Sequence, residues 1–235
     1  MPEHPEQVAQ LLDTIFAAAP YSINAASPGF MGYIPGGGIF HSAVADLIGD
    51  ALNRYVGVSA VTPIFNQIEA NVIRWFCEIV GYPATARGFL TSGGSLANLS
   101  ALITARYVRL GEDFSKGMIY ISDQAHHCLE KAARLAGFPQ ANFRVLETDD
   151  HFRLTPESVV AAIAEDRAKG LTPFLLAASA GTTNTGAVDP LPELAALAKN
   201  ENLWFHVDGA YGGFFSMTAR GRERLRGLEQ ADSLV

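Results

Sequence analysis

Four polar segments of the chain combine residue types that could do chemistry, and each follows a short apolar run. They are Thr91–Asn98, Ser122–His127, Ala180–Pro190 and His206–Gly213. The first places glycines and serines directly before a helical pattern, where free backbone N–H groups and the helix dipole would bind a phosphate. A tight strand–helix turn with serine caps is the alternative. The segment has neither the GK[ST] ending of a P-loop nor a GxGxxG fingerprint.

The other three segments offer a histidine, hydroxyls and a carboxylate. His126 could stack on a flat ring or exchange protons, or it could be a buried histidine at a capped helix start. Asp208 ends an apolar run, where an unpaired carboxylate would be costly to bury, so it needs a cationic partner or several donors. A protonated pyridine nitrogen would serve, as would a structural hydrogen bond. The hydroxyl-rich segment Ala180–Pro190 also fits a turn with a helix cap at Asp189.

Composition narrows the class of protein. The chain has 235 residues, 17 basic and 24 acidic, with a net charge of −7, which argues against a general nucleic-acid binder. Its two cysteines are too few for a disulfide scaffold. No metal site is expected, because the adjacent His126, His127 and Cys128 could not converge on one ion. No signal peptide or membrane span is recognisable. We expect a soluble, cytoplasmic protein.

These segments need elements that bring them together. Before residue 85 the pattern is helical and rich in loops, with helices expected at Pro5–Phe16, from Ser42 to Arg54, and from Pro63, after an N-cap at Thr62, to Gly81. From Gly88 onward, apolar runs alternate with helical patterns. The expected strands are Gly88–Thr91, Met118–Ser122, Phe143–Glu147, Pro173–Ser179 and Leu203–Val207. The expected helices are Leu96–Arg109, His127–Ala136, Pro156–Lys169 and Leu191–Asn200.

This alternation predicts an α/β fold, a mainly parallel sheet sandwiched by helices. In such sheets, ligands bind beyond the carboxyl ends of the strands, where the four polar segments stand. The arginines that follow, Arg220, Arg222, Arg224 and Arg226, are interpreted as a solvated helical face, because the aromatic residues of a nucleic-acid surface are missing.

In this order, the segments resemble the group II pyridoxal-phosphate (PLP)-dependent amino-acid decarboxylases, a family that includes aromatic L-amino-acid decarboxylase. The likeness covers Tyr33–Gly36, Thr91–Asn98, Ser122–His126, Gly181–Asp189 and His206–Tyr211. It implies PLP as cofactor, a homodimer and the type I, aspartate-aminotransferase-like fold. It also implies a helical segment at 1–85 for dimerisation and substrate binding. Residues 86–235 would be an incomplete large PLP-binding domain, and the C-terminal domain would be absent.

The resemblance assigns two catalytic roles. His126 would stack on the pyridine ring and assist proton transfer, and Asp208 would pair with the ring nitrogen so that the ring acts as an electron sink. His206 stands two residues before Asp208 and points to the same side of the strand, which gives it a supporting role. Further cofactor contacts would come from Gly94, Ser95, Thr183 and Ala210. The substrate side would be formed by Tyr33, Pro35 and Gly36.

The family's Schiff-base lysine has no good counterpart among Lys116, Lys131, Lys169 and Lys199. In the family it follows a short strand in an Asp/Asn-Pro-His-Lys motif. Residues 231–235 resemble the start of that strand, so the lysine is expected a few residues beyond Val235. The chain is therefore interpreted as the amino-terminal part of a longer enzyme, inactive by itself.

The implied reaction is decarboxylation of an L-amino acid, an aromatic one by resemblance, to an amine and CO2. Acidic and diamino acids stay open as substrates. Another PLP-dependent carbon–carbon lyase, or an aldehyde-forming enzyme, is the second hypothesis. The third is a non-catalytic truncated paralogue that binds a partner or the cofactor. A nucleotide-binding oxidoreductase is disfavoured, because the glycine fingerprint and the acidic ribose ligand are missing.

Overall fold

The computed structural model describes residues 7–33 and 38–235, which fall into two compact units, Met1–Tyr55 and Val56–Val235. The first unit contains helix α1 (Val8–Ala18), a 3-10 turn at Ala19–Tyr21 and helix α2 (Phe40–Leu52). Both helices lie near their expected positions. No residue of either helix is buried within the chain, although both carry apolar side chains. Their stability is therefore not explained by their own packing.

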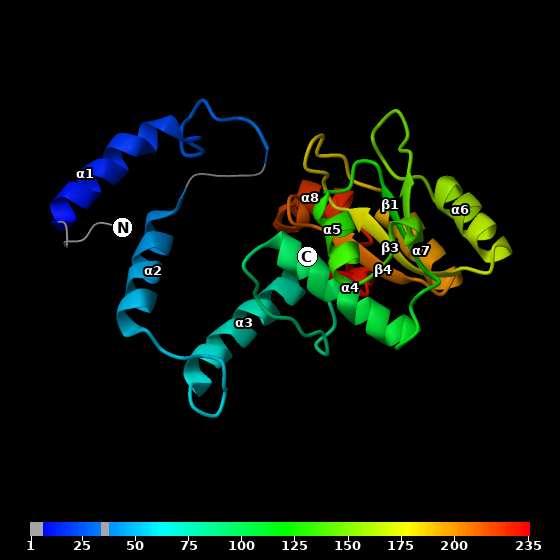
Figure 1. Ribbon diagram of the computed structural model, residues 1–235, viewed down its shortest axis with the longest axis horizontal. Helices are drawn as coiled ribbons and strands as arrows, with labels where there is room; N and C mark the ends of the chain where they lie inside the picture. Colours follow the sequence, from blue (N-terminus) through cyan, green and yellow to red (C-terminus); the bar gives the residue numbers. More distant parts are fainter. Residues whose placement is uncertain (1–6, 34–37) are drawn as a thin grey trace. The chain divides into compact units, whose positions relative to one another are not determined.

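The second unit is built on a five-stranded parallel sheet with the order β2-β1-β3-β4-β5 (Figure 1). The strands are β1 (Gly117–Ser122), β2 (Phe143–Leu146), β3 (Thr172–Ser179), β4 (Trp204–Asp208) and β5 (Ser233–Leu234). Every residue of β1 is buried, as its continuous apolar run predicted. The expected α/β fold is confirmed.

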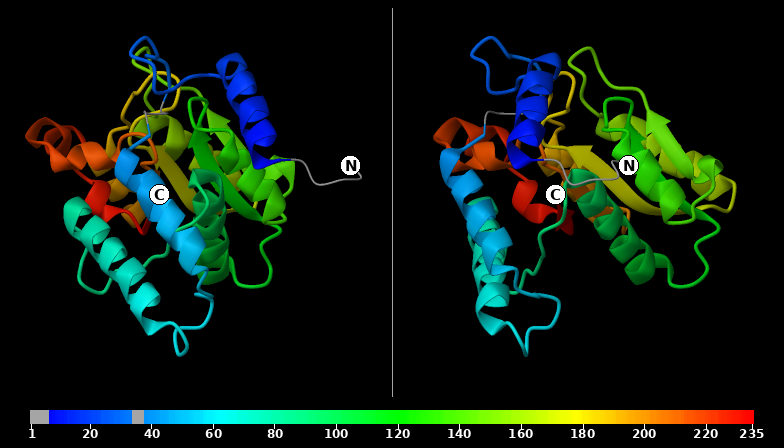
Figure 2. Two further views of the ribbon diagram at one scale, coloured as in Figure 1. Left: turned by 90° about the vertical axis from the view of Figure 1, so that its left-hand side faces the viewer. Right: turned by 60° about the vertical axis from the view of Figure 1, so that its left-hand side comes forward.

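Helices cover both faces of this sheet, and the two turned views in Figure 2 show the same layers. One face packs against α4 (Gly94–Leu110) and α5 (Cys128–Leu135), through a core that includes Leu102, Leu129, Ile121 and Leu175. The other face packs against α6 (Pro156–Ala168) and α7 (Leu191–Asn200). Strand residues alternate between these two cores, so each site residue on a strand faces a definite pair of helices.

Helix α3 (Pro63–Val80) also belongs to the sheet unit. Pro63 is its first residue, Thr62 precedes it, and Gly81 ends it in a left-handed conformation with φ of 87°, as the sequence predicted. The Phe76 ring packs edge-on against Phe214, with centroids 4.9 Å apart. The compact units thus divide at residue 55, whereas the sequence suggested a functional boundary near residue 85.

The expected strand at Gly88–Thr91 is wrong. This segment has no strand conformation, and Phe89 and Leu90 are exposed. The Leu90 N–H donates to a carboxylate oxygen of Glu69 at 2.8 Å, an acceptor on α3 and not on a neighbouring strand. A short apolar run predicts a tendency to be buried, but a strand also needs a partner with free backbone groups.

Near the C-terminal end of the chain, the short helix α8 (Ala219–Arg224) is capped by the Thr218 hydroxyl. The four arginines Arg220, Arg222, Arg224 and Arg226 are exposed, as expected, but Arg226 lies beyond the end of α8, so the four do not form one helical face. Short 3-10 turns occupy Gln140–Asn142, Gly213–Met217 and Leu228–Gln230. Within residues 7–33 and 38–235, no helix is both long and apolar enough to cross a membrane.

Candidate functional site

The polar segments predicted from the sequence follow β1, β3 and β4, and parallel pairing brings the carboxyl ends of these strands to one edge of the sheet. Helix α4 begins at the same edge. A Cβ atom built on Gly94 would lie 3.5 Å from the Cβ of Ala210, which follows β4. The helix N-terminus predicted to bind phosphate is therefore in contact with the segment that carries Asp208.

The turn before α4 has the geometry of an anion site. Gly93 has φ of 148°, a conformation that favours glycine, and its carbonyl accepts the N–H groups of Leu96 and Ala97. The first N–H groups of a helix, here those of Gly94 and Ser95, have no acceptor within the helix. Gly94 also leaves the approach to them free of a side chain. The predicted positions of Gly94 and Ser95 at a helix N-terminus are confirmed; phosphate binding by them remains a prediction.

Ser95 and His126 both approach the start of α5. Hydrogen bonding from the Ser95 and Asn98 side chains partly offsets the burial that raises the pKa of the Cys128 thiol. The half-buried His126 ring accepts the Cys128 N–H at its Nδ1 atom, at 3.3 Å. The neutral ring therefore carries its proton on Nε2. The His127 ring lies 4.1 Å away, tilted by 41°.

Asp208 is half-buried at the end of β4, and both of its carboxylate oxygens accept hydrogen bonds. Oδ2 accepts from the Asn98 side-chain amide at 3.0 Å, and Oδ1 accepts from the Ala210 N–H at 3.1 Å. Asp208 and His206 both face α4, whereas Phe205 and Val207 face the core on the other side of the sheet. The prediction that His206 and Asp208 share one side of the strand is confirmed.

His206 is buried and hydrogen-bonded at both ring nitrogens. Nε2 lies 2.7 Å from Oδ1 of Asn98, and Nδ1 lies 2.8 Å from the Ser233 hydroxyl. Burial lowers the pKa of His206 to about 4, so the ring is neutral near pH 7. It thus supports the site as a hydrogen-bonding group and not as a cation.

Asn98 is the site residue that sequence reasoning missed. It was quoted in the Thr91–Asn98 turn without a role, yet it joins His206 to Asp208 from α4. Its signal was its spacing: Asn98 lies on the same helical face as the buried Leu102 and Ala105. A polar residue on an apolar stripe must find partners, and here it finds them on β4.

The loop after β3 closes on itself beside Tyr211. Ala180 and Val188 form an isolated antiparallel bridge, and the Thr182 N–H donates to the Ala187 carbonyl at 2.9 Å. A Cβ on Gly181, whose φ is 108°, would lie 2.9 Å from the Tyr211 ring. The half-buried Thr183 is therefore carried on a loop that packs next to the Ala210 segment. Among the described residues its hydroxyl has no hydrogen-bond partner, which leaves it available to a ligand.

Asp189 does not cap α7, contrary to the alternative considered from the sequence. The residue preceding that helix is Pro190. The buried Asp189 carboxylate instead accepts the backbone N–H groups of Leu154 and Ser179, at 2.8 and 2.7 Å. Burial raises its pKa to about 6, and the two backbone hydrogen bonds oppose that rise. Asp189 fastens the loop after β3 and does not face a ligand.

The substrate-side residues lie in the first unit or outside the described part. Tyr33 is exposed and adopts a left-handed backbone with φ of 60°. Pro35 and Gly36 lie outside the described residues. The substrate-binding role of these three residues remains a prediction.

The lysines stand where the sequence placed them. Lys116 precedes β1 at the amino edge of the sheet, and Lys131 lies within α5. Lys169 follows α6, and Lys199 lies in the last turn of α7. Lys116, Lys169 and Lys199 are therefore away from the carboxyl ends of the strands, whereas Lys131 lies in the first turn of α5, near that edge, and is exposed. In residues 7–33 and 38–235, no group of three or more histidine, cysteine, aspartate or glutamate side chains is arranged to hold a metal ion.

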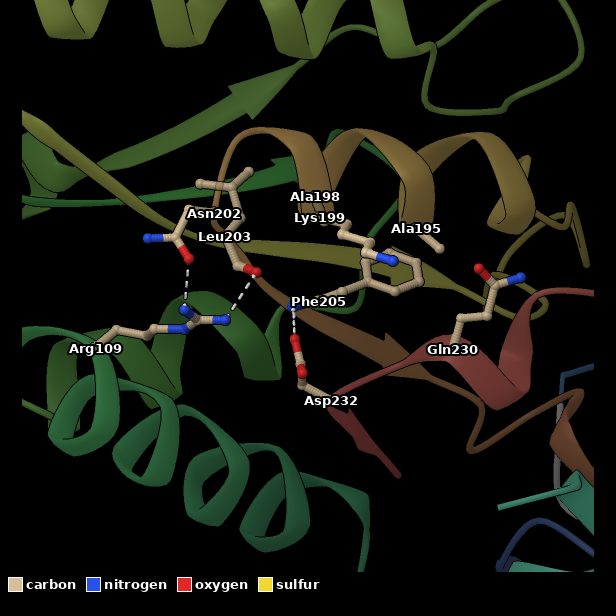
Figure 3. A pocket seen from close by; sticks show the side chains of 9 residues that line it. All are labelled: Arg109, Ala195, Ala198, Lys199, Asn202, Leu203, Phe205, Gln230 and Asp232. Carbon is tan, nitrogen blue, oxygen red and sulfur yellow. Dashed lines mark hydrogen bonds between the residues drawn. The ribbon is translucent and has the colours of Figure 1, made fainter. Parts of the chain in front are cut away.

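A cavity of about 360 Å³ lies at the opposite edge of the sheet, near the amino end of β4 (Figure 3). Arg109 donates to the Asn202 side chain and the Leu203 carbonyl, while Asp232 accepts the Phe205 N–H. Arg109 and Asp232 therefore both have hydrogen-bond partners within the protein. The cavity is remote from the constellation around Asp208, so the chemistry of the side chains, and not cavity size, identifies the candidate site.

Comparison with known proteins assigns the chain to a family. The model of the pyridoxal-dependent decarboxylase conserved domain matches residues 1–235. The chain belongs to this family of PLP-dependent decarboxylases, as the motifs predicted.

Curated relatives show how far substrates vary within the family. An aromatic-L-amino-acid decarboxylase of Bacillus atrophaeus is 39% identical over 88% of this chain and 43% of its own length. A phenylacetaldehyde synthase of Arabidopsis thaliana is 37% identical over 99% of this chain and 50% of its own length. An acidic amino acid decarboxylase of Xenopus tropicalis is 32% identical, over 98% and 46%. The chain thus spans about half the length of these relatives.

Solved structures confirm the fold. Mouse CSAD in its apo form matches with a TM-score of 0.92 and 29% identity, over 100% of this chain and 51% of that one. Oryza sativa TDC with PLP and tryptamine matches with a TM-score of 0.89 and 27% identity, over 100% and 54%. The described elements therefore correspond to about half of a type I PLP-dependent decarboxylase.

Proposed function

We propose that the protein containing this chain decarboxylates an L-amino acid, an aromatic one, to an amine and CO2, with PLP as cofactor. The observation that carries the proposal is the placement of Asp208. Its carboxylate is held by Asn98 and by the Ala210 N–H, and Ala210 contacts the N-terminus of α4. Family membership and the relative from Bacillus atrophaeus support the reaction and the substrate class.

The donor set at this edge fits PLP. The N-terminus of α4 offers backbone N–H groups and a positive dipole end to a phosphate, and Gly94 leaves it accessible. Asp208 offers an anionic acceptor to a protonated ring nitrogen. When bound, PLP supplies an electron-withdrawing ring that takes up the electron pair left as CO2 departs.

The chain's own residues would orient and bind. Gly94 and Ser95 would hold the phosphate, Ala210 would pack below the ring, and His126 would stack on it. Because Nδ1 of His126 accepts the Cys128 N–H, the proton available to a ligand is the one on Nε2. The Thr183 hydroxyl would hydrogen-bond near the edge of the PLP ring. The loop that carries it lies against Tyr211, next to the Ala210 segment. Tyr33, with Pro35 and Gly36, would contact the substrate.

The reaction is tested on the protein that contains this chain. Purified protein is supplied with PLP and with aromatic, acidic or diamino acids in turn, and CO2, amine, aldehyde and ammonia are measured. Equal CO2 and amine from an aromatic amino acid is the expected result. Aldehyde with ammonia in place of amine would instead establish the aldehyde-forming reaction, which the relative from Arabidopsis thaliana favours. Absence of CO2 with every substrate would contradict the proposal.

Residues 1–235 alone are expected to bind PLP without turnover. Covalent attachment of PLP to a protein needs a lysine amine, and none of the four lysines of this chain directly follows a strand at its carboxyl end. Incubating this segment with PLP and an aromatic amino acid should give no amine, whereas the protein that contains it should give amine. Amine formed at a comparable rate by the segment would contradict this expectation.

We also expect a cytoplasmic homodimer. The exposed apolar residues of α1 and α2, such as Leu11, Ile15 and Leu47, support a partner surface in the first unit. Sedimentation equilibrium of the protein that contains this chain should give twice the subunit mass.

A further inference from the structure

The buried amide of Asn98 makes three hydrogen bonds. The residue is 1% exposed, and both the oxygen and the nitrogen of its side chain have partners. Oδ1 lies 2.7 Å from Nε2 of His206, and Nδ2 lies 3.0 Å from Oδ2 of Asp208 and 3.3 Å from the Cys128 sulfur. These contacts come from β4 and from the start of α5, so the amide is held from more than one element.

Asp208 determines which way the amide points. A carboxylate only accepts hydrogen bonds, so the Asn98 atom next to Asp208 must be the NH2 group. The Asn98 oxygen then faces His206. Since that oxygen only accepts, Nε2 of His206 must carry the ring proton.

Ser233 fixes the other nitrogen of the ring. Its hydroxyl oxygen lies 2.8 Å from Nε1 of Trp204, which can only donate, and 2.8 Å from Nδ1 of His206. The hydroxyl therefore accepts from Trp204 and donates to Nδ1, which bears no proton. Burial of His206, which is 2% exposed, lowers the pKa of the ring to about 4 and keeps it neutral. Every hydrogen bond from Trp204 to Asp208 thus runs in one direction.

This chain of hydrogen bonds ends on the acid that faces the candidate cofactor site. We propose that Asn98 is a positioning residue that fixes the orientation of the Asp208 carboxylate toward the ring nitrogen of PLP, and that the proton on Nε2 of His206 fixes Asn98. The inference rests on the proposed function, because it assumes that PLP occupies this site. It assigns to Asn98, Ser233 and Trp204 a role that the sequence did not predict.

Two substitutions of Asn98 separate its contact to His206 from its contact to Asp208. Asn98→Leu removes the acceptor for His206 and the donor for Asp208. Asn98→Asp keeps the acceptor, loses the donor and places a second carboxylate beside Asp208. Loss of a hydrogen bond to a charged group should raise the PLP dissociation constant at least about tenfold in both variants. Calorimetric titration of the protein that contains this chain measures that constant without depending on turnover.

The histidine proton gives an independent readout. A long-range ¹H–¹⁵N spectrum of apo protein labelled with ¹⁵N-histidine reports which nitrogen of His206 is protonated, with His206→Gln to assign the signal. The wild type and Asn98→Asp should carry the proton on Nε2, and Asn98→Leu should lose this preference. A role limited to packing would not move the proton. The spectrum of the wild type tests the arrangement even if Asn98→Leu does not fold.

Asn142 provides a matched control. It is buried and donates its amide to the carbonyls of Ser115 and Gly117, at the amino edge of the sheet. Asn142→Leu should lower stability in a similar way but change the PLP dissociation constant by less than about twofold, because no contact to the site is lost. Far-UV circular dichroism confirms that each variant is folded.

The outcomes distinguish the inference from the proposed function. Weakened PLP binding in both Asn98 variants, normal binding in Asn142→Leu and a proton on Nε2 support the inference. Wild-type affinity in Asn98→Asp, or a wild-type proton on Nδ1, overturns it even though PLP binds. If the wild-type protein shows no saturable PLP binding, the proposed function fails, and the positioning role fails with it.

Discussion

Two aspartates stand near neighbouring strand ends of the same sheet, and they are held in opposite ways. Asp208, after β4, is half-buried and bonded to one side-chain amide and one nearby backbone N–H. Asp189, ten residues beyond the end of β3, is 3% exposed and bonded to two backbone N–H groups from distant segments. The Asp208 carboxylate is hydrogen-bonded but still partly exposed, whereas the Asp189 carboxylate is enclosed.

The difference shows that position at a strand end does not by itself identify a ligand-binding carboxylate. Both residues lie where ligands of parallel sheets are found. Only the supporting groups separate a carboxylate that can meet a ligand from one that fastens a loop. Asp189 joins the Leu154 backbone to the end of β3, and so stabilises the loop that carries Thr183. Variants of the two residues should therefore affect different properties.

The largest effect should come from Asp189→Ala. This change leaves the N–H groups of Leu154 and Ser179 buried without an acceptor, and together they should lower the free energy of unfolding by about 3 kcal/mol. Urea unfolding at pH 4, below the folded-state pKa of Asp189, measures the loss. Asp123→Ala is the matched control, because Asp123 also follows a strand but is exposed, and its loss should change stability by less than about 0.5 kcal/mol. Equal losses would show that Asp189 is no more structural than an exposed acid.

The pH dependence of stability should carry the signature of Asp189. Because burial raises its pKa from 3.8 to about 6, the folded protein binds this proton more tightly than the unfolded chain does. Its contribution to stability is therefore greatest below pH 3.8, falls as the pH rises to about 6, and is constant above that. A rise of this size corresponds to about 3 kcal/mol over the whole window.

Comparison with Asp189→Asn isolates this contribution from those of other groups. The wild type should lose stability relative to Asp189→Asn between pH 4 and pH 7, measured by urea unfolding at each pH. A difference that stays constant across that window would mean that Asp189 titrates as an ordinary exposed carboxylate. It would remove the contrast with Asp208.

Asp208→Asn should have the opposite profile. The amide keeps the size of the carboxylate but cannot pair with a protonated ring nitrogen, so PLP affinity should fall by about 10- to 100-fold. Stability should change little, because Asp208 is half-buried and its loss does not strand distant backbone groups. Calorimetric titration with PLP and urea unfolding measure the two properties on the same sample. A large loss of stability with unchanged PLP affinity would reverse the roles of the two aspartates.

The sequence predicted this edge of the sheet well, for a physical reason. Parallel strands connected by helices bring their carboxyl ends to one edge, so the order of apolar runs already places His126 and Asp208 together. Gly94 reaches the same edge at the start of α4, although the run before it is not a strand. Asn98 could not be assigned in this way. Its partners depend on how α4 is rotated against β4, which is decided by the packing of residues such as Leu102 and Ala105.

The errors have the same origin. Gly88–Thr91 had the apolar character of a strand, but no neighbouring strand pairs with it, and its Leu90 N–H turns to Glu69 instead. Asp189 had the local pattern of a helix cap. Its carboxylate instead accepts the N–H groups of Leu154, which is distant in sequence, and of Ser179, at the end of β3. Local pattern gives a tendency, and tertiary contacts decide both whether a strand forms and what each polar side chain does.

The smallest effect should come from Ser95→Ala. The first N–H groups of α4 bind an anion through the backbone, so loss of one exposed hydroxyl removes a single contact worth about 0.5–1.5 kcal/mol. PLP affinity should fall by about 2- to 12-fold, while the free energy of unfolding stays within about 0.5 kcal/mol of the wild type. Ser92→Ala is the matched control, since Ser92 is exposed in the same turn but precedes the helix. If both alanine variants weaken PLP binding equally, the phosphate is held by the turn as a whole. If neither variant weakens PLP binding, backbone groups alone hold the phosphate. Side chains such as Asp208 would then contact only the ring of PLP.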